Sequence, residues 1–155
     1  MKKSPIIGSS AIAYRWACER LKGYRQIVFD IGSGNGEGTL MLQKSGLKVV
    51  AIDRSSAAIE ACDAKGVLAY CYSYGANSDP FQAPYAAVLI NTLDEDHHPT
   101  GIVKHLAENA DAVLFTISRP DYPKGAWEFL TPKPSILQDL AYPSRLLVEW
   151  RKPPA

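Results

Sequence analysis

Short apolar runs alternate along this chain with amphipathic stretches, and polar or glycine-rich turns separate them. The apolar runs are rich in β-branched residues and predict strands at residues 26–31, 47–52, 67–72, 86–90 and 112–117. The amphipathic stretches begin near serine or threonine and predict helices at residues 9–21, 39–44, 55–66 and 100–109. Beyond Pro120 prolines become frequent, and we expect one short helix near 136–141 and one strand near 146–150.

Strands that alternate with helices predict a mostly parallel sheet, because parallel neighbours need crossover connections that place helices on the sheet faces. The expected fold is α/β, a Rossmann-like doubly wound sheet in a three-layer αβα arrangement, abbreviated at its C-terminal end. A length of 155 residues matches a single domain, and an apolar fraction of 46% is enough for one buried core.

Charge and cysteine content narrow the setting of the protein. Lys and Arg number 17 against 16 Asp and Glu, so the net charge of +1 provides no overall field for nucleic acid or an acidic membrane. The three cysteines lack a Cys-x-x-Cys spacing, which argues against a disulfide framework or a thiolate zinc site. Arg15, Glu19 and Arg20 interrupt the first apolar stretch, so we expect neither a signal peptide nor a membrane span. The expected location is the cytoplasm.

A glycine-rich turn follows the first predicted strand, where a sheet of this kind opens a crevice for a ligand. Gly32, Gly34 and Gly36 remove β-carbons there, so the backbone can bend sharply and approach a ligand. Glu37 stands where a dinucleotide motif needs its third glycine and would repel pyrophosphate, and no P-loop Gly-Lys-Ser/Thr follows. The Asp30 carboxylate before the glycines instead favours a ligand with an ammonium group.

A second acidic residue ends the second predicted strand. Asp53 can accept hydrogen bonds from both hydroxyls of a ribose, as the acidic residue of dinucleotide folds does. S-adenosylmethionine (SAM) carries an ammonium, a sulfonium and a ribose diol without any phosphate, so it suits this pair of acids where NAD does not. The simpler alternative is that Asp53 only caps the next helix and that the glycines form only a tight turn.

These residues resemble the class I SAM-dependent methyltransferases, in particular the compact small-molecule type. The resemblance extends over about residues 10–118 and rests on Tyr14-Arg-Trp-Ala17, Lys22-Gly23, Asp30-Ile-Gly-Ser-Gly-Asn-Gly-Glu-Gly-Thr39 and Val50-Ala-Ile-Asp53. It implies one methyltransferase-like domain over residues 1–155. That domain would contain an N-terminal helix at 1–24, a cofactor-binding core at 25–118 and an abbreviated C-terminal part at 119–155.

The resemblance also implies where SAM would lie. Asp30 and the backbone of Gly32, Ser33, Gly34 and Gly36 would hold its methionine moiety. The ribose and the adenine fall to residues that follow the next strands.

By the same resemblance Asp53 would bind the ribose and Arg54 would flank the adenine. Arg15 lies where the preceding helix folds over the cofactor and would meet its carboxylate, although a surface arginine explains it equally well. Tyr74 would contact the adenine ring in place of the usual acid, with a simple turn as the alternative. Asn91 follows the fourth strand, where such enzymes face cofactor and substrate together.

The segment after Asn91 carries the candidate catalytic groups. His97 or Asp94 would act as a general acid or base, since imidazole and carboxylate both serve near neutral pH. The same groups suit a divalent ion, but their spacing matches no metal signature and Pro99 constrains His98, so no metal site is predicted. A solvated loop is the alternative to both roles.

The sequence therefore predicts a SAM-dependent methyltransferase with an unidentified acceptor. A small-molecule acceptor is favoured and a macromolecular one stays open, while nucleic acid is not indicated and no membrane partner is expected. The alternative is a non-catalytic SAM-binding module, or a partner subunit of an enzyme complex. The short C-terminal part motivates it, because a protein partner or a second copy would then complete the pocket.

Overall fold

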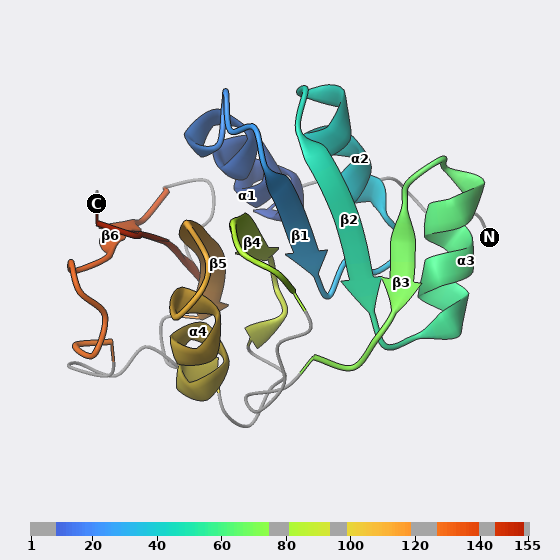
Figure 1. The fold of residues 1–155 in the computed structure, drawn as a ribbon. Coiled ribbons are helices and arrows are strands. Elements are labelled where there is room, and N and C mark those ends of the chain that lie inside the picture. The colour runs from blue at the N-terminus through green and yellow to red at the C-terminus, as the bar shows by residue number, and fades with distance from the viewer. Residues whose placement is uncertain (1–8, 75–80, 94–98, 119–126, 140–144, 154–155) are drawn as a thin grey trace.

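One sheet organises the residues that the computed structural model describes, which are 9–74, 81–93, 99–118, 127–139 and 145–153 (Figure 1). Its strands lie in the order β3-β2-β1-β4-β5-β7-β6. They are β1 Ile27–Ile31, β2 Lys48–Asp53, β3 Ala69–Cys71, β4 Tyr85–Leu89, β5 Ala112–Ser118, β6 Ser135–Leu137 and β7 Arg145–Arg151. The pairs among β1 to β5 are parallel, and β7 is antiparallel to both β5 and β6. The mostly parallel α/β sheet predicted from the sequence is confirmed.

Helices cover both faces of this sheet. They are α1 Ser9–Arg20, α2 Glu37–Lys44, α3 Ser56–Ala64 and α4 Pro99–Ala107. In Figure 1, α1 and α2 lie behind the sheet and α4 lies in front of it. Because α3 packs against Ala51, which shares a strand face with Val49 beneath α1 and α2, it belongs to the rear layer. None of these described helices is long and apolar enough to cross a membrane.

Local sequence explains where α3 begins and why β4 and β5 are apolar. The Ser55 side chain accepts a hydrogen bond from the Ala58 backbone N–H at 3.2 Å and so caps the start of α3. Every residue of β4 is buried, and only the last residue of β5 is partly exposed. Continuous burial is what strands covered on both faces require, so these two strands form the centre of the molecule.

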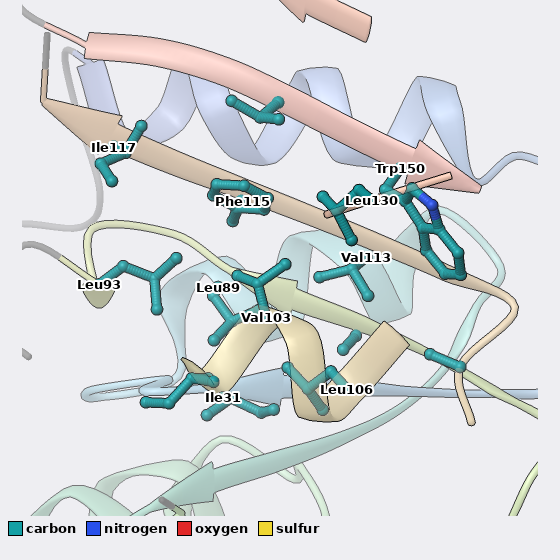
Figure 2. Packing of buried hydrophobic residues seen from close by; sticks show 14 of the residues in the cluster. Ile31, Leu89, Leu93, Val103, Leu106, Val113, Phe115, Ile117, Leu130 and Trp150 are labelled. Carbon is teal, nitrogen blue, oxygen red and sulfur yellow. The ribbon is translucent and has the colours of Figure 1, made fainter. Parts of the chain in front are cut away.

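The larger part of the core lies between the sheet and α4 (Figure 2). Val103 and Leu106 of α4 are fully buried and meet Leu89 and Phe115 from the middle of the sheet. The Phe115 and Trp127 rings lie 4.9 Å apart, which connects the C-terminal part to the same core. This packing fixes the ends of the central strands, where the candidate site lies.

The C-terminal part departs from the sequence prediction at one place. A helix was expected near 136–141, but Ser135–Leu137 forms the strand β6, and residues 140 and 141 lie outside the described part. Pairing of Ile136 with Val148 of β7 gives this segment the backbone partners that an isolated helix of one or two turns lacks. The predicted helix is therefore wrong. After β5, the described residues contain the strands β6 and β7.

A partly buried ion pair ties α1 to β7. Arg20, in the last turn of α1, donates to the Glu149 carboxylate of β7 at 2.6 Å and 3.2 Å. Arg151 also donates to Glu149, which is only 7% exposed. The C-terminal end of α1 is therefore held against the sheet, and Tyr14 in the middle of α1 lies against Gly38 of α2.

Candidate functional site

A cavity of about 440 Å³ lies at the carboxyl ends of β1, β2, β3 and β4. This is the edge at which open parallel sheets bind ligands, and the volume falls within the range of small-molecule and cofactor sites. Its wall combines backbone, carboxylate, amide, hydroxyl and aromatic groups. The lining residues are Ile31, Gly32, Gly34, Ile52, Asp53, Arg54, Ser55, Tyr72, Ser73, Tyr74, Asn91 and Thr92.

The glycine turn forms one wall, and its shape depends on missing β-carbons. Gly32 has a φ of 77°, and a Cβ there would lie 2.4 Å from the Thr92 Oγ1. Its backbone N–H donates to the Ile52 carbonyl at 2.7 Å, which holds the turn against β2. Only glycine fits this position, because both the backbone angle and the space exclude a side chain.

Asp53 lies at the junction of the glycine turn and the start of α3. Its Oδ2 accepts from the Gly34 N–H and its Oδ1 accepts from the Ser55 N–H, both at 2.9 Å. A carboxylate offers about four acceptor positions, so two remain for a ligand. Since Asp53 also lines the cavity, it combines a structural role with unused acceptor capacity.

Asp30 occupies a different place from the one its position in the motif suggested. The sequence placed its carboxylate at the crevice, but the side chain is fully buried and is not part of the cavity wall. Side chains alternate along a strand, so Asp30 points toward α1 and α2 while the next residue, Ile31, borders the cavity. The Tyr14 hydroxyl donates to both Asp30 oxygens at 3.1 Å, and the Thr39 hydroxyl donates to Oδ2 at 2.7 Å. Burial raises the pKa of Asp30 to about 7.

Asn91 and Thr92 form the wall that follows β4. Asn91 has a φ of 58°, and its side-chain amide donates to the Ser10 hydroxyl at 2.6 Å. Its backbone N–H donates to the Thr116 hydroxyl at 2.8 Å, and the Thr92 hydroxyl donates to the Ile31 carbonyl at 3.0 Å. The first turn of α1 and the ends of β1, β4 and β5 are therefore fixed around one side of the cavity.

Aromatic rings stand behind the opposite wall. Tyr74 lines the cavity and its ring is nearly parallel to that of Phe81, with centroids 5.6 Å apart. Phe81 in turn stacks on Phe29 of β1 at 3.9 Å. Arg54 lies in the same lining, directly after Asp53. This side of the cavity offers a planar ring and a guanidinium, both of which can contact a flat heterocycle.

The remaining predicted positions divide into three groups. Ser33 and Gly36 shape the glycine turn without lining the cavity, since Ser33 is buried near Cys62 and Gly36 precedes α2 with a φ of 91°. Arg15 is exposed on α1 and lies outside the cavity wall. Asp94 and His97 lie outside the described residues.

The sequence reasoning missed several wall residues. Thr92, Ser55 and Tyr72 line the cavity but carry no motif of their own. Each lies at or shortly after the end of a predicted strand, and that position was the one signal that would have pointed to them. Among the residues that the structure describes, no cluster of three or more His, Cys, Asp or Glu side chains is arranged to hold a metal ion.

Sequence comparison decides the family. A model of the family described as methionine biosynthesis protein MetW matches residues 19–140. The chain belongs to the MetW family. This family is of the class I methyltransferase type, so the resemblance predicted from the motifs is confirmed. No curated protein matches this chain significantly.

Solved structures share the fold of this MetW-family chain. Magnesium protoporphyrin IX methyltransferase from Synechocystis PCC 6803 with bound SAM matches with a TM-score of 0.69 and 13% identity over 93% of this chain and 82% of its own. The N-methyltransferase NodS from Bradyrhizobium japonicum WM9, in complex with S-adenosyl-L-homocysteine (SAH), gives 0.67 and 14% over 95% and 89%. The ribosomal protein L11 methylase from Lactobacillus delbrueckii subsp. bulgaricus gives 0.66 and 22% over 92% and 79%. At these identities the likeness establishes a common Rossmann-like methyltransferase fold.

Proposed function

We propose that this chain binds SAM in the cavity at the glycine turn and transfers its methyl group to an acceptor. The single observation that carries the proposal is Asp53, a carboxylate on the cavity wall with two acceptor positions unused. A ribose diol offers two hydroxyl donors to such a group. The methyltransferase type of the MetW family and the SAM and SAH bound in structural neighbours support the same cofactor.

The same wall also carries groups suited to the methionine moiety and the adenine of SAM. We place the methionine moiety against the turn from Gly32 to Gly36, where the backbone is bare enough for close approach. We place the adenine between Tyr74 and Arg54, beyond the ribose at Asp53. Asn91 then lies on the side of the cavity where the methyl group and the acceptor meet. Arg15, outside the cavity wall, has no role in this arrangement.

The chemistry asks little of the protein beyond alignment. When bound, SAM supplies an electrophilic methyl group on its sulfonium, and transfer is an in-line displacement by the acceptor. The residues of the wall hold the cofactor, orient its sulfonium toward the acceptor and exclude water. A general base is needed only where the acceptor is protonated at the working pH.

His97 and Asp94 are proposed for that proton transfer. They follow Thr92, a wall residue, by five and two positions in the sequence. The expected result is that His97→Ala lowers kcat for a protonated acceptor and leaves the Kd for SAM unchanged. Unchanged turnover in this variant would remove His97 from the reaction.

A small-molecule acceptor is favoured, in a cytoplasmic setting. Of the three neighbours described above, one is named for magnesium protoporphyrin IX and one is named an N-methyltransferase. The third is named for ribosomal protein L11, so the same fold also serves a protein acceptor. We therefore propose a small-molecule acceptor without naming it, and a macromolecular acceptor as the second choice.

A non-catalytic SAM-binding module or partner subunit is the second candidate function. The front of β1, β2 and β3 carries no helix among the described residues (Figure 1), and we propose that a partner or a second copy would bind on that side. The two functions separate in a release assay for SAH. An enzyme releases SAH with some acceptor pool, whereas a module binds SAM and SAH and releases none even with partners present.

The Asp53→Ala variant tests the placement of SAM. The variant loses the ribose acceptor and the bonds from the Gly34 N–H of the glycine turn and the Ser55 N–H at the start of α3, so we expect at least a tenfold higher Kd for both SAM and SAH by calorimetry. Asp63→Ala removes an exposed carboxylate from α3 and serves as the control, with unchanged affinity. A folded Asp53→Ala protein with the wild-type Kd would contradict the proposal.

A further inference from the structure

One buried side chain connects α1 to the segment that carries the glycine turn. Tyr14 is 4% exposed, and its hydroxyl reaches both oxygens of the fully buried Asp30. Its ring lies directly on α2, because a Cβ at Gly38 would be 2.1 Å from the Tyr14 Cζ. Tyr14 therefore contacts the strand before the turn through its hydroxyl and the helix after the turn through its ring.

The Asp30 carboxylate joins the two ends of the glycine turn. Asp30 lies two residues before Gly32, and Thr39 lies three residues after Gly36. The 2.7 Å bond from the Thr39 hydroxyl to Asp30 thus closes the loop that contains the turn. The two bonds from Tyr14 add a third point of support from α1.

We propose that Tyr14 is a positioning residue for the cofactor, acting through the Asp30 carboxylate behind the glycine turn. The inference rests on the proposed function, since it concerns how the turn is set for SAM. Tyr14 is not among the residues that line the cavity, so we infer that its effect passes through Asp30, Gly38 and the backbone of the turn.

The charge on Asp30 matters as well as its geometry. The described groups that face it are the hydroxyls of Tyr14 and Thr39, the Asp53 carboxylate on β2 and, across the register, apolar Val88 on β4. The Cys62 thiol of α3 lies within electrostatic range of it. The nearby Lys65 is paired with Glu37 at 3.7 Å. Ionised Asp30 therefore places a buried negative charge behind a turn where a cation is proposed to bind.

Binding of SAM is expected to depend on pH for this reason. Burial raises the pKa of Asp30 to about 7, so part of the ligand-free protein is protonated there at neutral pH. A bound cation favours the ionised carboxylate, which means that binding releases a proton when the pH lies near or below that pKa. The affinity for SAM should fall as the pH drops below about 7, by up to tenfold per pH unit.

Tyr14→Phe is the test, because it keeps the ring on Gly38 and removes only the hydroxyl. The lost hydrogen bonds to ionised Asp30 should move the midpoint of the pH profile of SAM affinity upward by about one pH unit. Thr39→Val should shift it in the same direction, and Thr39→Ser should restore the wild-type profile. Tyr24→Phe is the matched control: its hydroxyl donates to Asp111 at 2.8 Å, far from the turn in sequence, and its loss should leave the profile unchanged.

The possible results separate the role of Tyr14 from the proposed function. A Tyr14→Phe profile that falls in parallel with the wild type, with the same midpoint, would reduce Tyr14 to a structural residue and overturn the inference. The titration of Asp30 in the ligand-free protein, followed by carboxyl ¹³C shifts, gives a readout that does not need SAM, and an unmoved midpoint there also overturns it. A wild-type protein that binds neither SAM nor SAH at any pH, while Tyr14→Phe still moves the Asp30 midpoint, overturns the proposed function instead.

Discussion

Asp30 is the residue at which stability and ligand binding oppose one another. Its carboxylate is fully buried and its described partners are two hydroxyl groups. An unfolded aspartate has a pKa of about 3.9, whereas burial raises that of folded Asp30 to about 7. The folded protein therefore binds a proton here more tightly than the unfolded chain does, and this contribution to stability is lost as the pH rises through about 7.

This sign leads to a prediction for Asp30→Asn. The wild-type free energy of unfolding should fall by roughly 2 to 3 kcal/mol between about pH 5 and pH 8 from this residue alone, measured by urea unfolding. In Asp30→Asn that fall should disappear, because the amide does not ionise. Asp63→Asn, on the exposed side of α3, should keep the wild-type slope. An Asp30→Asn protein with the wild-type slope would show that Asp30 does not titrate in this range.

The motif around Asp30 also shows where residue-level reasoning stops. The glycine spacing and the two acids predict the ligand-binding edge of the sheet, and Asp53 lies on the cavity wall there. The sequence did not predict the sheet face toward which the Asp30 side chain points, because the motif gives the order of residues but not the strand face on which each side chain lies. That face depends on α1, whose Tyr14 supplies the partner from 16 residues earlier in the chain.

At the scale of elements, the packing of α1 on α2 depends on Gly38. Alanine favours a helix over glycine by about 1 kcal/mol, but a Cβ at this position would overlap the Tyr14 ring. Overpacking of this kind costs about 1 to 3 kcal/mol, so the clash should exceed the gain in helix propensity. We expect Gly38→Ala to lower the free energy of unfolding by about 1 to 2 kcal/mol.

A double-mutant cycle checks this explanation. In a Tyr14→Leu background the ring is absent, so Gly38→Ala should cost little or become stabilising. Equal costs in both backgrounds, measured by chemical unfolding, would mean that the Tyr14 ring is not the obstacle.

Sequence pattern predicts the helices and strands of the first 118 residues well because most apolar runs there are buried by their neighbours, although Leu68 and Tyr70 at β3 are exposed. The starts differ by small steps: α2 begins at Glu37 rather than 39, since the turn after Gly36 leads directly into the helix. The error at β6 has another cause. Ile136 and Leu137 are about half exposed, and their strand conformation comes from pairing with β7, a distant segment that local propensity does not include.

For the molecule as a whole, the order of strands brings together the cavity walls from segments far apart in the sequence. The glycine turn follows β1, Asp53 ends β2, Tyr74 follows β3, and Asn91 follows β4. Alternating elements predict this edge, because the carboxyl ends of parallel strands meet there. The acceptor cannot be predicted in this way. The sequence motifs concern the SAM site, whereas the shape of the acceptor site depends on segments that carry no motif.

The most direct test of the central claim is a calorimetric titration of the wild type, Gly34→Arg and Gly66→Arg with SAM, SAH and NAD. Gly34 lines the cavity with open space where its Cβ would lie, so an arginine there should fill the site without disturbing the core. Gly66 has a similarly positive φ and open space away from the cavity, so it reports backbone strain alone. We predict that SAM and SAH bind the wild type and Gly66→Arg but not Gly34→Arg, and that NAD binds none. Binding of NAD alone, or SAM binding unchanged in Gly34→Arg, would contradict the account.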